Sequence, residues 1–434
     1  IGEPLTNIHF GNMSAWTAWA FFGKDVKTMT TEEVQENNDI VSYIEQMAQW
    51  KFPPGFNAEI PPLRLNLDPI FVTQRPFLFY ACIYMFTLFT HFVLFFIFGF
   101  SLLAQFSTAG QKIYYRKARK PNASNGLPIV FVHGIGAGFT HYLPIISQFP
   151  DDVDIFLVEW PYVAMQMTTS APSAEESVRS VMKVLDFYNH EKATFLAHSL
   201  GTVLVSWMFH DPACASKVAS TVLLDPIIFL LCDPTVASVF VYKDPTDCWD
   251  LLMHFFLSRE LFISNALSRH FAWSYNILFV EELLNNKACC SKFHPHLMLP
   301  TSTSEKSKLK ADQHILRLSS LSEDKATSNV SEPSSEVVFS EELWKKHHTK
   351  HRDIEHTIIL ATNDMIVPTA RVSRYLTAKK REGYNNFELI VFEGTHGEVT
   401  FLPKWIQVVK KKLYDRSHIH RTNIHEAISP PEAL

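Results

Sequence analysis

The sequence predicts an α/β fold with a mostly parallel sheet and helices on both faces, an inserted helical cap, and a transmembrane helix in front of them. Three observations support this prediction. Short apolar runs alternate with helix-like stretches after about residue 127 and again near the C-terminus. An aromatic, helix-like stretch and then a polar one interrupt this alternation between Pro226 and about His351. A long uncharged apolar run precedes it.

The 434 residues leave room for one large domain or two modest ones. We expect seven parts: a non-cytosolic segment (1–75), a transmembrane helix (76–105), the first part of the α/β core (110–225), a helical cap (226–298), a disordered Ser-rich loop (299–345), the second part of the core (346–415) and a C-terminal tail (416–434).

Phe77 to Ala104 contains no Lys, Arg, Asp or Glu, and roughly 20 apolar residues suffice to cross a bilayer. A buried core helix is the alternative. Basic residues follow the run: Lys112, Arg116, Lys117, Arg119 and Lys120. Because positive residues stay on the cytoplasmic side, we expect a single-pass protein whose large domain, everything after Gln111, is cytosolic. Asn12 would then begin a non-cytosolic glycosylation motif, Asn-Met-Ser.

Six apolar runs have the character of buried strands, and one helix start is marked clearly. Ser173 and Glu176 form a capping box that opens the periodic stretch "AEESVRSVMKVLDFYN". The strand-like runs are "LPIVFVHG", "VDIFLVEW", "ATFLAHSL", "KVASTVLLDP", "HTIILATND" and "FELIVFEGTHG". Strands and helices that alternate in this way indicate a parallel sheet.

Composition excludes several classes of function. The net charge of −5 lacks the basic excess that nucleic-acid binding requires. The six cysteines are scattered and show no CxxC spacing, so neither a disulfide scaffold nor a thiolate metal site is expected. Histidine groups such as "HHTKH" lack an accompanying carboxylate or thiol pattern. We expect no metal and no cofactor.

The stretch "ATFLAHSLGTVLVSW" at 193–207 joins a strand to a helix through small-x-Ser-x-Gly. A sharp strand-to-helix turn of this kind exposes its serine, here Ser199, at the edge of a sheet. Ala197 and Gly201 are small, as close backbone approach requires. His198 is expected to pack at this turn and not to react.

Two later strands end in residues that suit Ser199. Asp364 follows one strand in "TNDMIVP", and His396 follows the next in "EGTHGEV". The carboxyl ends of parallel strands meet at one edge, so these side chains should converge on Ser199. Asp225 in "LLDPI" also ends a strand and is the alternative acid.

A glycine-rich turn follows the first strong strand, at His133-Gly134-Ile135-Gly136. We expect it to present a backbone amide, that of Ile135, opposite the amide of Leu200, so that the pair forms an oxyanion hole. Gly134 and Gly136 allow the turn, and His133 is expected to support it through hydrogen bonds.

These motifs resemble the α/β-hydrolase superfamily, specifically its membrane-anchored lipase and esterase branch, over about residues 110–415. The resemblance implies that Ser199 is the nucleophile, that His396 is the general base and acid, and that Asp364 orients the imidazole. It implies no cofactor. Ala197 departs from the usual first glycine of the serine turn.

The predicted bilayer contact and an apolar cap rich in Phe, Leu, Ile and Trp favour lipid-like substrates. We therefore expect a membrane-bound serine hydrolase that cleaves carboxylic esters of lipids through an acyl-enzyme. Its partners would be the lipid bilayer and a lipid ester, without nucleic acid. An acyltransferase with the same triad and an inactive membrane scaffold are the alternatives.

Overall fold

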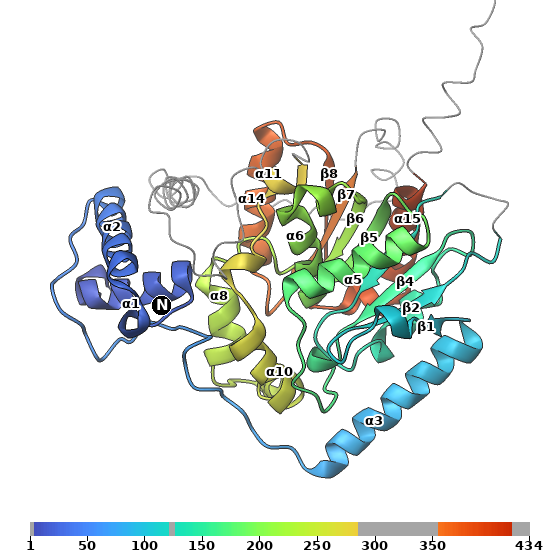
Figure 1. Ribbon diagram of the computed structural model, residues 1–434, viewed down its shortest axis with the longest axis horizontal. Helices are drawn as coiled ribbons and strands as arrows, with labels where there is room; N and C mark the ends of the chain where they lie inside the picture. The colour runs from blue at the N-terminus through green and yellow to red at the C-terminus, as the bar shows by residue number, and fades with distance from the viewer. Residues whose placement is uncertain (1–3, 121–125, 285–354, 419–434) are drawn as a thin grey trace, which may run out of the picture. The chain divides into compact units, whose positions relative to one another are not determined.

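The computed structural model describes residues 4–120, 126–284 and 355–418. They fall into two compact units, one within residues 1–67 and one formed by the later described residues. The larger unit is an eight-stranded mixed sheet with helices on both faces (Figure 1). The predicted Ser-rich loop (299–345) and the tail beyond residue 418 lie outside the described residues.

The sheet confirms all six predicted strands as a parallel set, β3 to β8. It adds an antiparallel edge of two strands, β1 and β2, that the sequence did not reveal. The order across the sheet is β1-β2-β4-β3-β5-β6-β7-β8. The bounds are β1 Ser101–Leu102, β2 Lys112–Arg116, β3 Ile129–Val132, β4 Ile155–Glu159, β5 Ala193–His198, β6 Val218–Leu224, β7 His356–Ala361 and β8 Phe387–Phe392.

Helices cover both faces of this sheet. In Figure 1, α5 (Ala174–Phe187) and α6 (Thr202–His210) lie in front of it and α15 (Pro403–Ser417) lies behind. The predicted capping box opens α5: the Glu176 amide donates to Ser173 Oγ at 3.1 Å and the Ser173 amide to Glu176 Oε2 at 2.8 Å. The other helices of this core are α4 (Leu143–Ile146), α7 (Pro212–Ala215) and α14 (Thr369–Arg381).

The cap is helical, as predicted, and enters between β6 and β7. Its described part consists of short α-helices joined by π and 3₁₀ turns. The bounds are α8 Pro234–Ala237, η8 Ser238–Tyr242, α9 Cys248–Met253, η9 His254–Ser258, α10 Leu261–Asn265, η10 Ala266–His270, η11 Ser274–Asn276 and α11 Val280–Leu284. The last predicted cap residues, 285–298, lie outside the described ones.

The N-terminal unit contains α1 (Phe10–Phe22) and α2 (Thr31–Ala48). Asn12 of α1 is buried, and its Nδ2 donates to the carbonyls of Asn57 at 2.8 Å and Ile60 at 3.1 Å. A glycan on Nδ2 would break both hydrogen bonds and has no room in this interior. The glycosylation expected at Asn12 is therefore wrong for the folded unit.

The long apolar run forms α3 (Phe77–Phe92), which continues as a π turn, η3 (Val93–Ile97). In the part of the chain that the structure describes, one helix is long enough and apolar enough to cross a membrane, and it is this one, Phe77–Ile97. It ends earlier than the predicted 105, because Gly99 takes a left-handed φ of 73° and turns the chain into β1. Residues 101–102 of the predicted span therefore belong to the sheet.

Candidate active site

Ser199 occupies the turn between β5 and α6 with a backbone φ of 50°, a left-handed conformation that costs energy for any residue with a Cβ. Gly201 explains why small residues flank it: a Cβ there would lie 2.5 Å from the Val132 carbonyl oxygen. Gly134 of the β3 loop is equally tight, because its Cβ would lie 2.8 Å from Ser199 Cβ. The turn is strained and its flanking positions need small residues, as predicted, but Ser199 is buried and not exposed.

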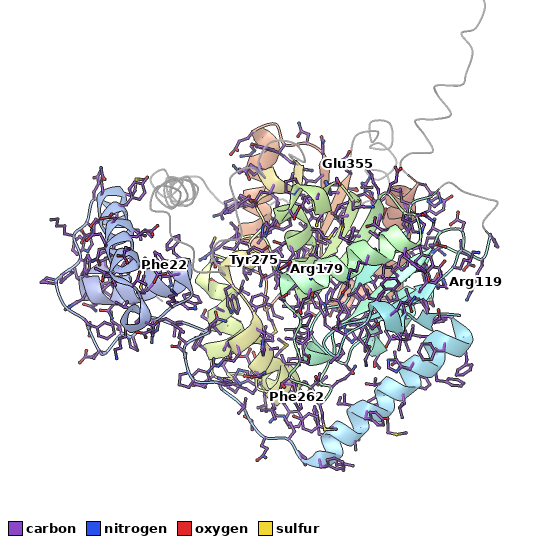
Figure 2. All side chains as sticks on the ribbon, in the orientation of Figure 1. Phe22, Arg119, Arg179, Phe262, Tyr275 and Glu355 are labelled. Carbon is purple, nitrogen blue, oxygen red and sulfur yellow. The ribbon has the colours of Figure 1, made fainter. Side chains whose placement is uncertain are left out.

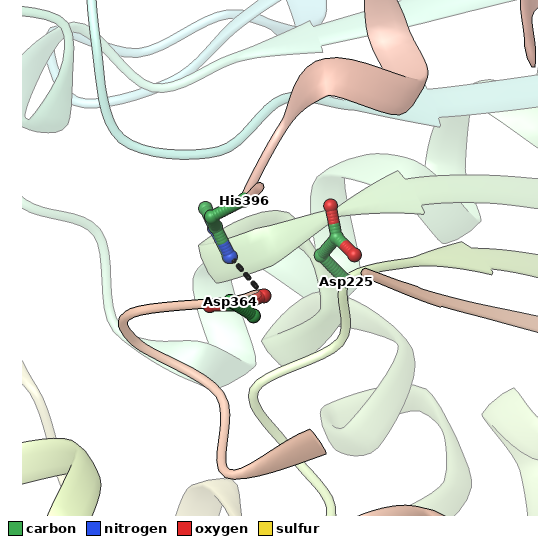
Figure 3. Close-up of side chains that lie close together, drawn as sticks. All are labelled: Asp225, Asp364 and His396. Atoms are coloured by element: carbon green, nitrogen blue, oxygen red, sulfur yellow. Dashed lines mark hydrogen bonds and ion pairs between the residues drawn. The ribbon is translucent and has the colours of Figure 1, made fainter. Parts of the chain in front are cut away.

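A continuous hydrogen-bond chain links Ser199, His396 and Asp364. The imidazole Nδ1 lies 2.6 Å from Asp364 Oδ2, and Nε2 lies 2.8 Å from Ser199 Oγ. The carboxylate can only accept, so Nδ1 carries the proton and donates to it. Nε2 of the neutral ring therefore accepts from the serine hydroxyl. Figure 3 shows His396 directed at Asp364, which lies on the loop after β7.

Asp225 approaches the same histidine from the end of β6 but binds backbone instead. Its Oδ1 accepts from the Ala361 amide at 2.9 Å and its Oδ2 from the Gly397 amide at 2.9 Å. Asp364 uses Oδ1 for two amides of its own loop, those of Ile366 and Val367, and leaves Oδ2 for the imidazole. The structure therefore places Asp364 at His396 Nδ1. The alternative acid, Asp225, instead accepts from the backbone amide of Gly397, the residue after His396.

The electrostatics favour the protonated imidazole. Burial alone would lower the pKa of His396, but the negative charge of Asp364, its hydrogen bond and the charge of Asp225 outweigh burial and raise that pKa to about 9. Burial and the neighbouring Asp364 raise the pKa of Asp225 to about 6, against the opposing charge of His396. The site is arranged to hold positive charge on His396 after it takes a proton.

The loop after β3 is held beside Ser199 by buried polar contacts. His133 Nε2 accepts from the Trp160 amide at 2.9 Å, so Nδ1 carries the proton and donates to the Gly134 carbonyl at 2.6 Å. Burial lowers the pKa of His133 and keeps the ring neutral. His133 thus supports this loop through hydrogen bonds, as the sequence analysis expected.

The amides of this loop are not equivalent. The Gly134 amide donates to Tyr142 Oη at 2.9 Å, and the Gly136 amide donates to the Val163 carbonyl at 3.1 Å. Among the described residues, no such acceptor is seen for the amide of Ile135 between them. Leu200 directly follows Ser199 in the turn η7 (Ser199–Gly201). The assignment of the Ile135 and Leu200 amides to an oxyanion hole stays a prediction.

Tyr142 is a residue that sequence reasoning missed. It is fully buried, and its Oη lies 2.6 Å from His198 Nδ1 while it accepts from the Gly134 amide. It therefore connects the β3 loop to the residue before Ser199. His198 packs against His396, with ring centroids 5.3 Å apart, which agrees with a packing role. No spacing rule pointed to Tyr142, because its partners lie 8 and 56 residues away.

Asp225, Asp364 and His396 also place carboxylate oxygens and a ring nitrogen within 4.8 Å of one another, which is a donor set that could hold a metal ion. In this arrangement, however, each of these oxygens already accepts a hydrogen bond from an amide or from the imidazole. A metal ion would have to displace the Asp364–His396 contact. The residues fit a catalytic triad better than a metal site.

The model of the alpha/beta hydrolase fold family matches residues 128–397 of the chain. No match is found among curated protein sequences. Solved structures provide similar folds. Naproxen esterase from Bacillus subtilis is 12% identical, with a TM-score of 0.40 over 76% of this chain and 96% of its own.

Two further structures are similar to the chain. A thermophilic esterase from Thermogutta terrifontis is 10% identical, with a TM-score of 0.39 over 71% of this chain and 94% of its own. A bacterial membrane phospholipase A is 11% identical, with a TM-score of 0.36 over 78% of this chain and 93% of its own.

Proposed function

The chain belongs to the alpha/beta hydrolase fold family, and from this premise we propose that it is a membrane-associated serine hydrolase that cleaves carboxylic esters of lipid-like substrates. The observation that carries the proposal is the unbroken hydrogen-bond chain from Ser199 Oγ through His396 to Asp364. A nucleophile, a base and an orienting group in contact are the arrangement that acyl transfer through serine requires.

In the proposed mechanism, Ser199 Oγ attacks the ester carbonyl carbon while His396 Nε2 takes the hydroxyl proton. The carbonyl oxygen becomes an anion, which the amides of Ile135 and Leu200 would receive. When the tetrahedral adduct collapses, the C–O bond breaks and Nε2–H protonates the leaving alcohol. Water then attacks the acyl-enzyme by the same route, which releases the acid and restores Ser199.

The two carboxylates near His396 support this sequence of steps. Asp364 holds Nδ1–H, so Nε2 faces Ser199 throughout the cycle. The charges of Asp364 and Asp225 stabilise the imidazolium that forms after attack. The free enzyme needs a neutral imidazole, so a pKa of about 9 for His396 requires that kcat/KM rise with pH up to that value.

The apolar cap supports a lipid-like acyl chain. A small cavity lies between the cap and the loop after β7, and its lining is mixed. The apolar residues are Val239, Phe240, Met253, Met365 and Ile366, and the polar ones are Lys243, Asp250, His254 and Ser258. Met365 and Ile366 directly follow Asp364 in the chain, so the cavity begins next to the triad. The exposed cap residues Leu251, Leu252, Phe255 and Phe256 give this region an apolar surface, which supports a lipid-like substrate.

Labelling with a fluorophosphonate probe tests the mechanism. Wild type and Ser216→Ala, which changes an exposed serine, should be labelled, and Ser199→Ala should not. With esters of increasing acyl length, the wild type should hydrolyse long chains faster than short ones. Ser199→Ala should hydrolyse none of them. Absence of labelling in the folded wild type would favour the inactive scaffold. Transfer of the acyl group to an added alcohol in preference to water would favour the acyltransferase.

A further inference from the structure

Helix α3 and the turn η3 have two different faces. Positions that are buried or half-buried recur every three or four residues: Tyr80, Ile83, Thr87, Thr90, Leu94 and Phe98. Large apolar side chains occupy the opposite face, each more than half exposed: Leu78, Met85, Phe89, Phe92 and Phe96. One face therefore packs on the α/β unit along the full length of the helix, and the other remains without a partner among the described residues.

Polar contacts fasten α3 to this unit at both ends. Near its start, Tyr80 Oη donates to Glu260 Oε1 of the cap at 2.7 Å. Near its end, His91 Nε2 lies 2.9 Å from Tyr114 Oη of β2, and Leu94 is part of the main core. Beyond the turn, Arg119 Nη2 donates to the Phe98 carbonyl at 2.6 Å.

These contacts conflict with a helix that crosses the bilayer. From Tyr80 to Phe98 the helix rises about 27 Å, at about 1.5 Å per residue, nearly the ~30 Å of a hydrocarbon core. If it spanned that core, the folded unit beside it would have to lie in hydrocarbon too. The sheet edge and the buried Glu260 carboxylate would then be surrounded by lipid, which irregular backbone and charged groups do not tolerate.

The exposed apolar face continues onto the cap. The ring of Phe79 lies 5.8 Å from that of Phe255 and 6.0 Å from that of Phe256, centroid to centroid. Further exposed cap residues are Leu251, Leu252 and Leu261. The acidic groups of this stretch are turned inward, since Asp250 and Glu260 are buried. The outer side chains of α3 together with those of residues 251–261 form one surface, here called the apolar face.

Basic residues follow the C-terminal end of the apolar face. Lys117, Arg119 and Lys120 are exposed just after β2. Figure 2 shows Arg119 beyond that end of α3 and Phe262 near the opposite end, where its ring lies 5.6 Å from that of Tyr80. An apolar surface with a basic rim complements a leaflet that carries anionic headgroups.

We propose that the apolar face seats in one leaflet of a phospholipid membrane, with α3 in the plane of the membrane and residues 1–75 on the same side as the α/β unit. This rests on the proposed function and deepens it, since it would hold the cap at the membrane that contains the substrate. The seating itself does not depend on Ser199. A helix that spans the bilayer, and a second copy of the chain on this face, are the outcomes that would overturn it.

Flotation of the purified full-length chain with vesicles of phosphatidylcholine and phosphatidylserine tests the surface. We expect Phe89→Glu in α3 and Phe256→Glu in the cap each to lower the partition coefficient at least about tenfold. The control Val391→Glu changes an exposed apolar residue on β8, at the opposite edge of the sheet, and should float like wild type. Thermal melting verifies that each variant folds, and Ser199→Ala should also float like wild type.

An in-plane helix leaves residues 1–75 and the α/β unit on the same side of the membrane, whereas a spanning helix puts them on opposite sides. Single cysteines at exposed Lys27 and Asn385, in a chain whose six cysteines are replaced by serine, are probed on sealed membranes with an impermeant maleimide. Reaction of both from the same side supports the proposal. Reaction from opposite sides, or full flotation of Phe256→Glu, overturns it in favour of spanning. A wild type that forms dimers in solution and does not float overturns it in favour of self-association.

Discussion

The ends of β6 and β7 carry the same residue in two different roles. Both strands run parallel, and an aspartate at the end of each approaches the loop of His396. Asp364 has its Oδ1 fixed by amides of its own turn and its Oδ2 on the imidazole. Asp225 has both oxygens on backbone amides, that of Ala361 at the end of β7 and that of Gly397 in the loop after β8. Nearness to a histidine therefore does not make a catalytic acid, because the backbone decides which oxygen remains for the ring.

The largest effect should come from Asp364→Asn. We expect kcat/KM to fall roughly 10³–10⁴-fold, because the amide cannot fix the tautomer that leaves Nε2 free to accept from Ser199. The loss of the adjacent negative charge also lowers the pKa of His396 from about 9, so the acid limb should move to lower pH. The pH dependence of kcat/KM on a soluble ester measures both. A loss below tenfold would show that Asp364 is not the orienting acid.

Asp225→Asn should cost less, roughly 10–100-fold in kcat/KM. Asparagine keeps one acceptor oxygen, so one of the Ala361 and Gly397 amides loses its partner and the loop of His396 shifts. The control is Asp233→Asn, which removes an ion pair with Arg371 outside the triad. If Asp225→Asn lowered kcat/KM as much as Asp364→Asn does, the assignment of Asp364 as the orienting acid would be contradicted.

A smaller effect is expected for Gly397→Ala, which leaves both carboxylates in place. Gly397 has a φ of 84°, and a side chain there costs about 1–2 kcal/mol of stability. Because its amide is the one that Asp225 holds, we expect a several-fold loss of kcat/KM as well. Gly383→Ala, with a φ of 103° and open space around it, should lose stability alone. Equal activity losses in the two variants would argue against the backbone role of Asp225.

The smallest effect concerns stability and pH. The pKa of Asp225 is raised to about 6 in the folded chain, so its contribution to stability is complete below the unfolded value near 3.8 and is lost as pH rises through about 6. The melting temperature of wild type relative to Asp225→Asn should therefore fall between pH 4 and pH 7. A difference that stays constant over this interval would show that the carboxyl of Asp225 is not perturbed.

Much of the candidate site could be predicted because its signals in the sequence are local. The serine turn needs small residues two positions either side of Ser199, and Asp364 and His396 each come a few residues after an apolar strand. The choice between Asp364 and Asp225 could not be settled in this way, since both satisfy the same pattern. Only the three-dimensional placement of the Ala361 and Gly397 amides distinguishes them.

The unpredicted parts depend on contacts between distant segments. β1 is two residues long and pairs only with β2, so no periodicity could mark it. The sequence of the uncharged run is that of a membrane-spanning helix. It gives no sign of the hydrogen bond between Tyr80 and Glu260, which lies 180 residues away. Asn12 matched a glycosylation motif, yet its side chain is used inside the N-terminal unit. Local patterns cannot report such partners.

The contacts that Gly134 and Gly201 make have a consequence for how this protein can vary. The segments that follow β3 and β5 pack closely at these two positions. A Cβ at Gly134 would clash with Ser199, and a Cβ at Gly201 would clash with the carbonyl oxygens of Val132 and His133. The turn of Ser199 and the loop after β3 can therefore only be displaced together. Each of these two sites therefore tolerates glycine alone.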